Sequence, residues 1–314
     1  MKYGQKRVIT VFIGESRPIK EKFMEQQPSL AYKTKQIIKN YEFAFKKNFG
    51  QNFLVDERVL DKIVASAELT PEDTVLEIGP GIGTLTQALA RHCKKVIAVE
   101  IDKTLIPILE ELLSDFDNIE LINEDILKVD IEELAAKNGG KKLKVVANLP
   151  YYITTPIIMN ILEKQLPVES ITVMIQKEVA YRMQAQPKSK DYGSLSLVTQ
   201  YYCTPYLVAN VPQNCFMPRP NVDSAVIRLT TLEKPAVDVN DRELLFHIIK
   251  TAFSQRRKTL LNCFFNAGGW DMSKEELTAL INEAGYDEKV RGEALSLEDY
   301  AKITAVFEKA LKKA

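Results

Sequence analysis

The chain has 314 residues, of which 46% are hydrophobic and 27% are charged, so it is long enough for one full domain and a smaller one. No apolar run approaches the ~20 residues that a membrane-spanning helix needs. The four cysteines lie far apart without a C-x-x-C pair, and the chain has only two histidines, which argues against a disulfide framework or a metal site and favours a protein of the reducing cytoplasm.

Charge is balanced overall but unevenly distributed along the chain. Lys plus Arg and Asp plus Glu number 42 each, yet residues 1–47 hold eleven Lys or Arg against four Glu, a net charge of +7. We interpret this arm, with Lys46 and Lys47 at its end, as an RNA-contacting segment; a solvated charged surface is the alternative. Residues 1–27 are expected to be a disordered extension or the product of a misassigned start.

A glycine-rich loop follows the first strongly apolar strand. Residues 74–78 predict a buried strand, and an amphipathic pattern beginning at Ile82 predicts the helix after the loop. Gly79 and Gly81 fit the dinucleotide-binding fingerprint, but the third glycine, Gly83, comes one residue too early. The strand-loop-helix context therefore predicts a nucleotide-type ligand but disfavours hydride transfer with a dinucleotide.

Acidic residues end the next two predicted strands. Residues 96–99 lead to Glu100, whose carboxylate could accept both hydroxyls of a ribose, and residues 119–122 lead to Asp125, which could accept an adenine amine. Each acid alone could instead be a solvated loop residue or a helix cap. Three successive strands would bring Gly79, Glu100 and Asp125 to the edge where open α/β sheets bind their ligands.

A second motif, Asn148-Leu149-Pro150-Tyr151, closes the apolar run 143–147. An adenine amine is a poor nucleophile, because its lone pair is shared with the ring, unless acceptors hold its two hydrogens. The Asn148 side chain and the Leu149 carbonyl could be those acceptors, with Pro150 fixing the backbone and Tyr151 stacking on the base. With the glycine loop, the motif indicates methyl transfer from a sulfonium donor to an exocyclic amine; a strand-ending turn is the alternative.

The spacing of apolar segments predicts two regions. Strands and helices alternate from residue 74 to residue 186, which indicates a doubly wound, mostly parallel sheet. Further strands are predicted at 171–175, 206–211 and 225–231, and helices at 57–67, 244–252, 259–265, 274–284 and 297–312. We therefore expect a catalytic domain over residues 28–233 and a small all-α domain over residues 236–314, joined by the linker Glu233-Lys234-Pro235.

Three consecutive cations, Arg256, Arg257 and Lys258, stand at the start of a predicted helix in the second region. They could contact RNA phosphates or could simply begin a basic helix. We favour phosphate contact.

Together these motifs make the chain resemble the ribosomal RNA adenine dimethyltransferases, and most closely those of bacteria that act on small-subunit (16S) rRNA. The resemblance extends from about residue 28 to the end of the chain. It rests on five segments in order: 49–54, 77–83, 148–151, 216–224 and 254–260. It implies a class I methyltransferase fold with a seven-stranded sheet.

The resemblance also implies roles for individual residues. Asn52 and Leu54 would cover S-adenosylmethionine, and Gly79 would back its methionine part. Glu100 would bind the ribose of this methyl donor and Asp125 its adenine.

At the substrate side of the site, the resemblance places the reacting amine on Asn148, within the motif formed with Leu149 and Pro150. Tyr151 and Phe216 would hold the target base between their rings, because an enzyme that modifies a base takes it out of its stack. Phe216 owes this role to the resemblance alone, since a Phe before a Pro-rich loop is otherwise a common loop anchor.

The implied activity is dimethylation of the N6 amines of two adjacent adenines in the 3′-terminal hairpin loop of 16S rRNA, a late step of small-subunit biogenesis. The implied partner is 16S rRNA within the immature 30S subunit, bound by a monomeric, cytoplasmic enzyme without a metal or a membrane contact. Two alternatives stay open: a large-subunit rRNA methyltransferase of the macrolide-resistance type, and a mainly non-catalytic small-subunit assembly factor.

Overall fold

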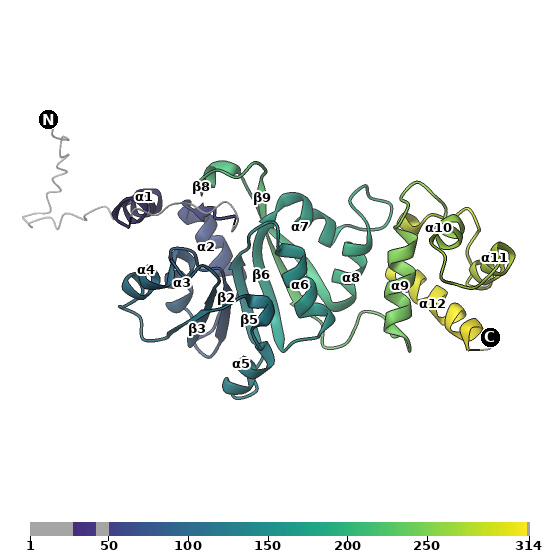
Figure 1. The fold of residues 1–314 in the computed structure, drawn as a ribbon, viewed down its shortest axis with the longest axis horizontal. Helices are drawn as coiled ribbons and strands as arrows, with labels where there is room; N and C mark the ends of the chain where they lie inside the picture. The colour runs from purple at the N-terminus through teal and green to yellow at the C-terminus, as the bar shows by residue number, and fades with distance from the viewer. Residues whose placement is uncertain (1–27, 42–49, 313–314) are drawn as a thin grey trace, which may run out of the picture.

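The computed structural model describes residues 28–41 and 50–312; residues 1–27, Lys46 and Lys47 lie outside the described residues. A seven-stranded sheet flanked by helices forms most of the molecule, and the C-terminal helices stand at one end of it (Figure 1). The predicted fold class, a doubly wound and mostly parallel seven-stranded sheet followed by helices, is confirmed.

The strands of the large sheet are β2 (Thr74–Ile78), β3 (Lys95–Glu100), β4 (Ile119–Asn123), β5 (Leu143–Asn148), β6 (Val168–Gln176), β7 (Cys203–Val211) and β9 (Ser224–Thr231). Their order across the sheet is β4-β3-β2-β5-β6-β9-β7. Strands β2 to β6 pair in parallel, whereas β9 is antiparallel to both β6 and β7. The strand order reverses between β2 and β5, and ligands of such sheets bind at that switch point.

Helices of the N-terminal part cover both faces of the sheet, and those of the C-terminal part stand at one end of it. They are α1 (Leu30–Asn40), α2 (Glu57–Ser66), α3 (Thr84–Ala90), α4 (Ile106–Leu112), α5 (Ile131–Lys137), α6 (Thr154–Glu163), α7 (Lys177–Gln184), α8 (Ser194–Tyr202), α9 (Arg242–Ala252), α10 (Leu260–Ala267), α11 (Lys274–Glu283) and α12 (Leu297–Leu311), with the short 3-10 turns η2 (Ile126–Lys128), η3 (Gln213–Cys215) and η4 (Gly292–Ala294).

Alternate residues of the central strands face different layers, as the two-residue period of a strand requires. Leu76 and Val145 pack with α5 and α6 in one hydrophobic cluster, whereas Val75 and Val146 pack with α2 and α3 in another. Both faces are covered, which explains why the parallel strands are apolar runs and do not alternate between apolar and polar residues. Asn148 has the same parity as Val146 and therefore belongs to the face covered by α2 and α3.

A two-stranded sheet lies beside the large one. In it, β1 (Phe53–Leu54) pairs antiparallel with β8 (Phe216–Met217), so that Leu54 is the register partner of Phe216. The pairing continues where the Val55 amide donates to the Cys215 carbonyl at 2.8 Å. The segment before α2 and the loop between β7 and β9 are thus fixed to each other, although they are far apart in the sequence.

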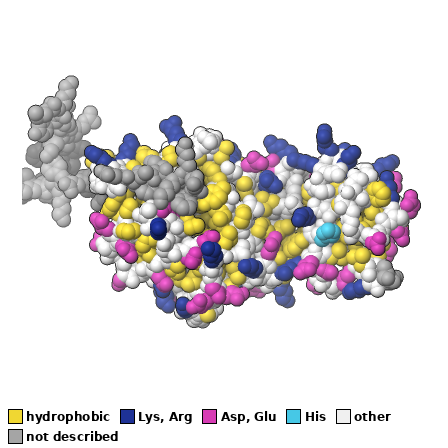
Figure 2. Space-filling view, viewed as in Figure 1, with side chains coloured by type: hydrophobic (Ala, Val, Ile, Leu, Met, Phe, Trp, Pro, Cys, Tyr) yellow, Lys and Arg dark blue, Asp and Glu magenta, His cyan; other side chains and the backbone are white. Residues whose placement is uncertain are grey.

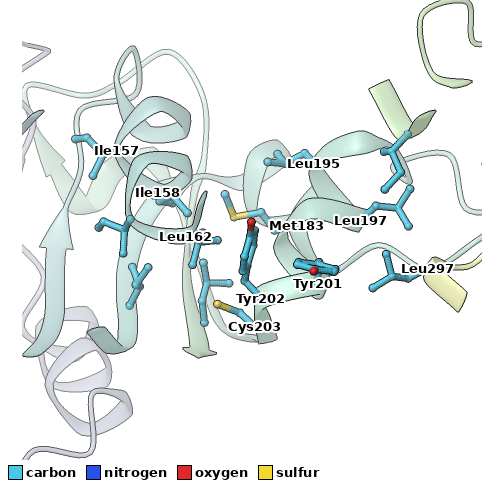
Figure 3. Packing of buried hydrophobic residues seen from close by; sticks show 14 of the residues in the cluster. Ile157, Ile158, Leu162, Met183, Leu195, Leu197, Tyr201, Tyr202, Cys203 and Leu297 are labelled. Atoms are coloured by element: carbon cyan, nitrogen blue, oxygen red, sulfur yellow. The ribbon is translucent and has the colours of Figure 1, made fainter. Parts of the chain in front are cut away.

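The C-terminal helices α9 to α12 begin and end within a few residues of the predicted bounds, and side chains cap their starts. Asp241 caps α9, and capping boxes begin α11 at Ser273 and α12 at Ser296. These helices share one hydrophobic cluster with α6 and α8. Figure 3 shows part of it, with Leu297 of α12 near α8 residues such as Leu197. The ring centroids of Tyr201 in α8 and Phe246 in α9, for example, are 5.1 Å apart. Side chains from the two sides of the predicted linker therefore pack against each other.

Candidate active site

A cleft opens where β2, β3 and β5 end, and it collects most of the residues that the sequence indicated. It encloses about 1130 Å³, its open mouth included, and its lining contains Asn52, Leu54, Gly79, Glu100, Asp125, Asn148, Leu149, Pro150 and Tyr151. Elements from Gly50 to Ile157 thus form one concave site at the switch point of the sheet, which is where a small-molecule ligand is expected.

The glycine loop has a backbone that residues with a side chain rarely adopt. Gly79 has φ +69°, and a Cβ at this position would meet nothing within 4 Å. Its amide donates to the Val99 carbonyl at 2.9 Å. Gly81 has φ +61°, and a Cβ there would lie 3.0 Å from the Phe53 ring. Gly79 therefore leaves space for a ligand beside the backbone, and Gly81 lets β1 pack closely over the loop.

Glu100 ends β3 inside the cleft and is 5% exposed. Its Oε1 accepts the Asp102 amide at 2.8 Å, and its Oε2 accepts the Gly81 amide at 3.3 Å. Burial, before any other cause, raises the pKa of Glu100, and these two amides oppose the shift. The carboxylate is held by backbone donors and retains lone pairs for further donors such as hydroxyl groups.

Asp125 also lies in the cleft, at the start of η2. Its Oδ1 accepts the Leu127 amide at 3.0 Å and so caps η2, which is the alternative role that the sequence left open. Its Oδ2 has no hydrogen-bond partner among the described residues, and one acceptor therefore remains for a ligand amine.

Glu77 is a buried acid of the cleft that the strand-end pattern did not indicate. It is 1% exposed, it lines the cleft, and its Oε2 has no hydrogen-bond partner among the described residues. Burial and then the nearby Glu100 carboxylate raise the pKa of Glu77 to about 8. An acid inside an apolar strand next to the glycine loop was the available sequence signal, because an isolated charge is costly there.

Glu77 should make the stability of the ligand-free protein depend on pH. In the unfolded chain it ionises near its ordinary pKa of 4.5, whereas in the fold it stays protonated up to about 8. Its contribution to the free energy of unfolding is therefore fully present below about pH 4.5 and is lost as the pH rises through about 8. The loss is on the order of a few kcal/mol. We expect Glu77→Gln to raise the melting temperature at about pH 8 but not at about pH 4. If the melting temperatures of the wild type and of Glu77→Gln differed by the same amount at every pH in this range, the raised pKa of Glu77 would be contradicted.

The side-chain amide of Asn148 is oriented by the segment that precedes α2. Its Nδ2 donates to the Asn52 backbone carbonyl at 2.9 Å, while the Asn52 side chain donates to the Gly50 carbonyl at 2.9 Å. With its NH2 group engaged, Asn148 has its Oδ1 left as an acceptor. Next to it, the buried Leu149 is held by its amide, which donates to the Met174 carbonyl of β6 at 3.1 Å.

The same segment is also tied to the other side of the cleft. Gln51 Nε2 donates to Asp102 Oδ2 at 3.1 Å, and Asp102 is 2% exposed. Residues 50–54 thus bridge the end of β5 and the end of β3. Spacing along the chain gave no indication of the Gln51 to Asp102 contact, because it joins two loops that are separate in the sequence.

Phe216 does not line the cleft. It is 4% exposed, it pairs with Leu54 through β8, and it packs in the hydrophobic cluster that contains Val59 and Ile63 of α2. The structure thus brings Tyr151 into the cleft but places Phe216 behind the lining. The position corresponds to the loop-anchor alternative, and a role at the target base stays a proposal.

The C-terminal cations stand apart from the cleft, after α9. Arg256, Arg257 and Lys258 are all exposed. The Arg256 guanidinium also donates to the Lys190 carbonyl and lies 3.7 Å from Glu293. In the view of Figure 2, Lys and Arg side chains stand out along the upper edge, above α7 and α10. Through its contact with Lys190, Arg256 links the loop before α8 to the C-terminal helices.

Two kinds of site are not found in residues 28–41 and 50–312. No group of three or more His, Cys, Asp and Glu side chains there is arranged to hold a metal ion. Among these residues there is also no helix with the length and apolar character of a membrane span.

Fold and site together define a methyltransferase of class I architecture, with a glycine loop and a strand-end acid beside an Asn-Leu-Pro-Tyr motif. Residues 42–309 match the family model described as ribosomal RNA adenine dimethylase. The chain belongs to this family, as the sequence resemblance predicted, and it is an rRNA adenine dimethyltransferase.

Curated relatives cover most of the chain. A protein of Lachnoclostridium phytofermentans named ribosomal RNA small subunit methyltransferase A is 57% identical over 281 residues, which are 89% of this chain and 97% of that protein. A protein of the same name from Clostridioides difficile is 50% identical and covers 87% of this chain and 94% of its own length.

Solved structures agree with this assignment. A dimethyladenosine transferase from Plasmodium falciparum has a TM-score of 0.69 at 27% identity and covers 82% of this chain and 98% of that one. The 23S rRNA methyltransferase ErmE has a TM-score of 0.63, also at 27% identity, and covers 82% of this chain and 99% of its own.

Proposed function

We propose that this rRNA adenine dimethyltransferase transfers methyl groups from S-adenosylmethionine to the N6 amines of two adjacent adenines in the 3′-terminal hairpin loop of 16S rRNA. The observation that carries the proposal is the Asn148 amide, whose Nδ2 is engaged by the Asn52 carbonyl at 2.9 Å. Its Oδ1 is thereby left as the acceptor that an exocyclic amine requires. The choice of the small subunit is supported by relatives that are about half identical and bear small-subunit names.

The cleft fits S-adenosylmethionine. Gly79 leaves room beside its backbone, Glu100 offers a buried acceptor for the ribose, and Asp125 offers Oδ2 for the adenine amine. Asn52 and Leu54 would cover the cofactor from the segment before α2. S-adenosylmethionine, when bound, supplies a methyl group on a cationic sulfur.

The Asn148 to Tyr151 motif would activate the target amine by position and charge. Asn148 Oδ1 and the Leu149 carbonyl accept its two hydrogens and favour the pyramidal geometry in which the nitrogen lone pair can attack. Because these acceptors are held before the amine arrives, little reorganisation accompanies the reaction. No strong general base is needed, because the nitrogen carries a positive charge once it has taken the methyl group, and it then releases one proton to water.

The target base would leave its stack and lie on the ring of Tyr151, with Phe216 on its other side. In this structure Phe216 is buried behind the lining of the cleft. The proposal therefore requires the loop that carries β8 to shift when RNA binds, whereas Tyr151 already lines the cleft.

RNA outside the cleft would be held by basic residues on either side of it. We assign this role to the arm ending in Lys46 and Lys47 and to Arg256, Arg257 and Lys258. The substrate would be 16S rRNA within the immature 30S subunit, methylated late in its biogenesis by a monomer in the cytoplasm.

A double variant tests the C-terminal cations. Arg256→Ala with Arg257→Ala should weaken subunit binding and flatten its log-log salt dependence by roughly 0.7 to 0.9 for each phosphate that is no longer neutralised. Cofactor affinity should not change. Lys302→Ala serves as the control, because the Lys302 side chain of α12 is 66% exposed and, like Arg256, lies near an acid, with its Nζ 3.9 Å from Asp299 Oδ1. An unchanged salt slope in the double variant would leave the arginines without a phosphate role.

The similarity to ErmE makes large-subunit methylation the main rival. Labelled S-adenosylmethionine, incubated with the protein and with small or large subunits from cells that lack the enzyme, separates the two. We expect label in small-subunit rRNA only. Label in naked large-subunit rRNA, with none in the small subunit, would overturn the proposal. A catalytically inactive Asn148→Ala variant that still binds small subunits would show that an assembly role is separable.

A further inference from the structure

Ser224, the last residue of segment 216–224, contacts Tyr151, and the sequence assigned it no role. The Tyr151 hydroxyl and the Ser224 hydroxyl are 2.6 Å apart and form a hydrogen bond. Ser224 is fully buried and begins β9, where it is the register partner of Gln176 in β6 and of Val211 in β7. Strands on both sides therefore fix its backbone, and its hydroxyl has little freedom other than rotation about one bond.

The topology explains why a serine at the start of a strand reaches the site. Because β9 runs antiparallel to β6, its first residue lies at the edge where the parallel strands end. Ser224 also has the same parity as Val226, which packs in the cluster under α2. It therefore faces the same layer as Asn148. Ser224 stands at the amino end of its strand, so the rule that site residues follow the carboxyl ends of strands does not indicate it.

The Tyr151 ring is constrained at both ends. At the backbone end, the Pro150 carbonyl accepts the Ile153 amide at 3.3 Å and the Thr154 hydroxyl at 3.0 Å, which ties the motif to the start of α6. At the other end, the phenol oxygen is bonded to Ser224. A tyrosine ring turns about two side-chain bonds only. Because the phenol oxygen lies on the axis of the second bond, fixing the backbone and the hydroxyl fixes the direction in which the ring extends from the backbone.

We propose that Ser224 is a positioning residue that fixes where the Tyr151 ring, on which the target adenine stacks, lies in the cleft. The inference rests on the proposed function, in which Tyr151 provides that stacking face. Stacking of a base on an aromatic ring depends on where the ring lies relative to the base. Ser224 acts by keeping the ring ready before the base enters, so that the amine arrives against Asn148 in the reactive position.

The test is a double-mutant cycle with Ser224→Ala, Tyr151→Phe and the combined variant, measured as methyl transfer to small subunits. Each single variant should lower kcat about fivefold, the equivalent of one hydrogen bond, with the KM for subunits nearly unchanged because remote contacts dominate binding. The combined variant should lose no more than either single variant, since both substitutions remove the same bond. Cofactor affinity, measured by calorimetry, should stay at the wild-type value.

Ser170→Ala is the matched control. Ser170 is 1% exposed in β6, paired with Thr230 near the other end of β9, so it reports the effect of truncating a buried serine in the same sheet. It should leave kcat unchanged. An effect of Ser224→Ala confined to melting temperature, or losses that multiply in the combined variant, would overturn the positioning role.

The outcomes distinguish this inference from the proposed function. If the wild-type protein does not methylate small subunits, the proposed function fails. If it does and Tyr151→Phe retains full kcat, only the positioning role fails. Tyr151→Phe keeps the ring and leaves β9 untouched, so the inference stays testable even where Ser224→Ala impairs folding.

Discussion

Asn148→Asp should reduce methyl-transfer turnover by about 100-fold or more while cofactor affinity stays within about threefold of wild type. The substitution keeps the size of the side chain and its Oδ1. It replaces the NH2 group that donates to the Asn52 carbonyl at 2.9 Å with an acceptor oxygen. Two acceptors repel each other at that distance, so the side chain must turn or residues 50–54 must move. In either case the acceptor for the amine is displaced.

The matched control is Asn118→Asp. Asn118 donates from Nδ2 to the Ala90 carbonyl at 2.8 Å and to the Cys93 carbonyl at 3.2 Å, and it precedes β4 at the opposite edge of the sheet. This variant should lose stability but keep its turnover. Single-turnover rates with saturating cofactor separate the two effects. Near wild-type rates for Asn148→Asp would refute the proposed activation of the amine.

Glu100→Ala should weaken S-adenosylmethionine binding by ~1 to 3 kcal/mol, because the ribose hydroxyls lose a buried acceptor and the Gly81 and Asp102 amides lose theirs. Those amides donate to Glu100 at 3.3 Å and 2.8 Å, so the glycine loop should loosen as well. RNA affinity should barely change, since this acid lies at the cofactor end of the cleft. Calorimetry measures the difference directly.

Glu124→Ala is the control for loss of an acid from the cleft. Glu124 also lines the cleft but is exposed, and its Oε1 accepts only the amide of Asp125, at 2.8 Å, among the described residues. It should bind the cofactor nearly as well as wild type does. Equal losses for Glu100→Ala and Glu124→Ala would show that general negative charge matters and that a specific ribose acceptor does not.

The sequence was most informative where chemistry coincides with a strand end. Gly79, Glu100 and Asn148 could each be placed at one sheet edge, because parallel strands joined by helices bring their carboxyl ends together. The structure puts all three in one cleft. The helices after the linker were also predictable, since amphipathic spacing and capping residues such as Ser273 and Ser296 determine their bounds.

Contacts between segments far apart in the sequence were not predictable. The Asn52 to Asn148 hydrogen bond spans 96 positions and the Tyr151 to Ser224 bond spans 73, and no periodicity links such pairs. The position of Phe216 depends on the pairing of β8 with β1, which two-residue strands do not reveal. The core shared across the linker was equally hidden, because spacing shows which face of a helix is apolar but not which neighbour covers it.

The most direct test of the proposed activity is nucleoside mass spectrometry of rRNA from small subunits that lack this modification, after incubation with S-adenosylmethionine and the wild-type protein. We expect N6,N6-dimethyladenosine at two adjacent positions of the 3′-terminal hairpin loop of 16S rRNA, forming at least about 100-fold more slowly with Asn148→Asp. Methyl groups on another atom of the base, on the ribose, or only in large-subunit rRNA would contradict it.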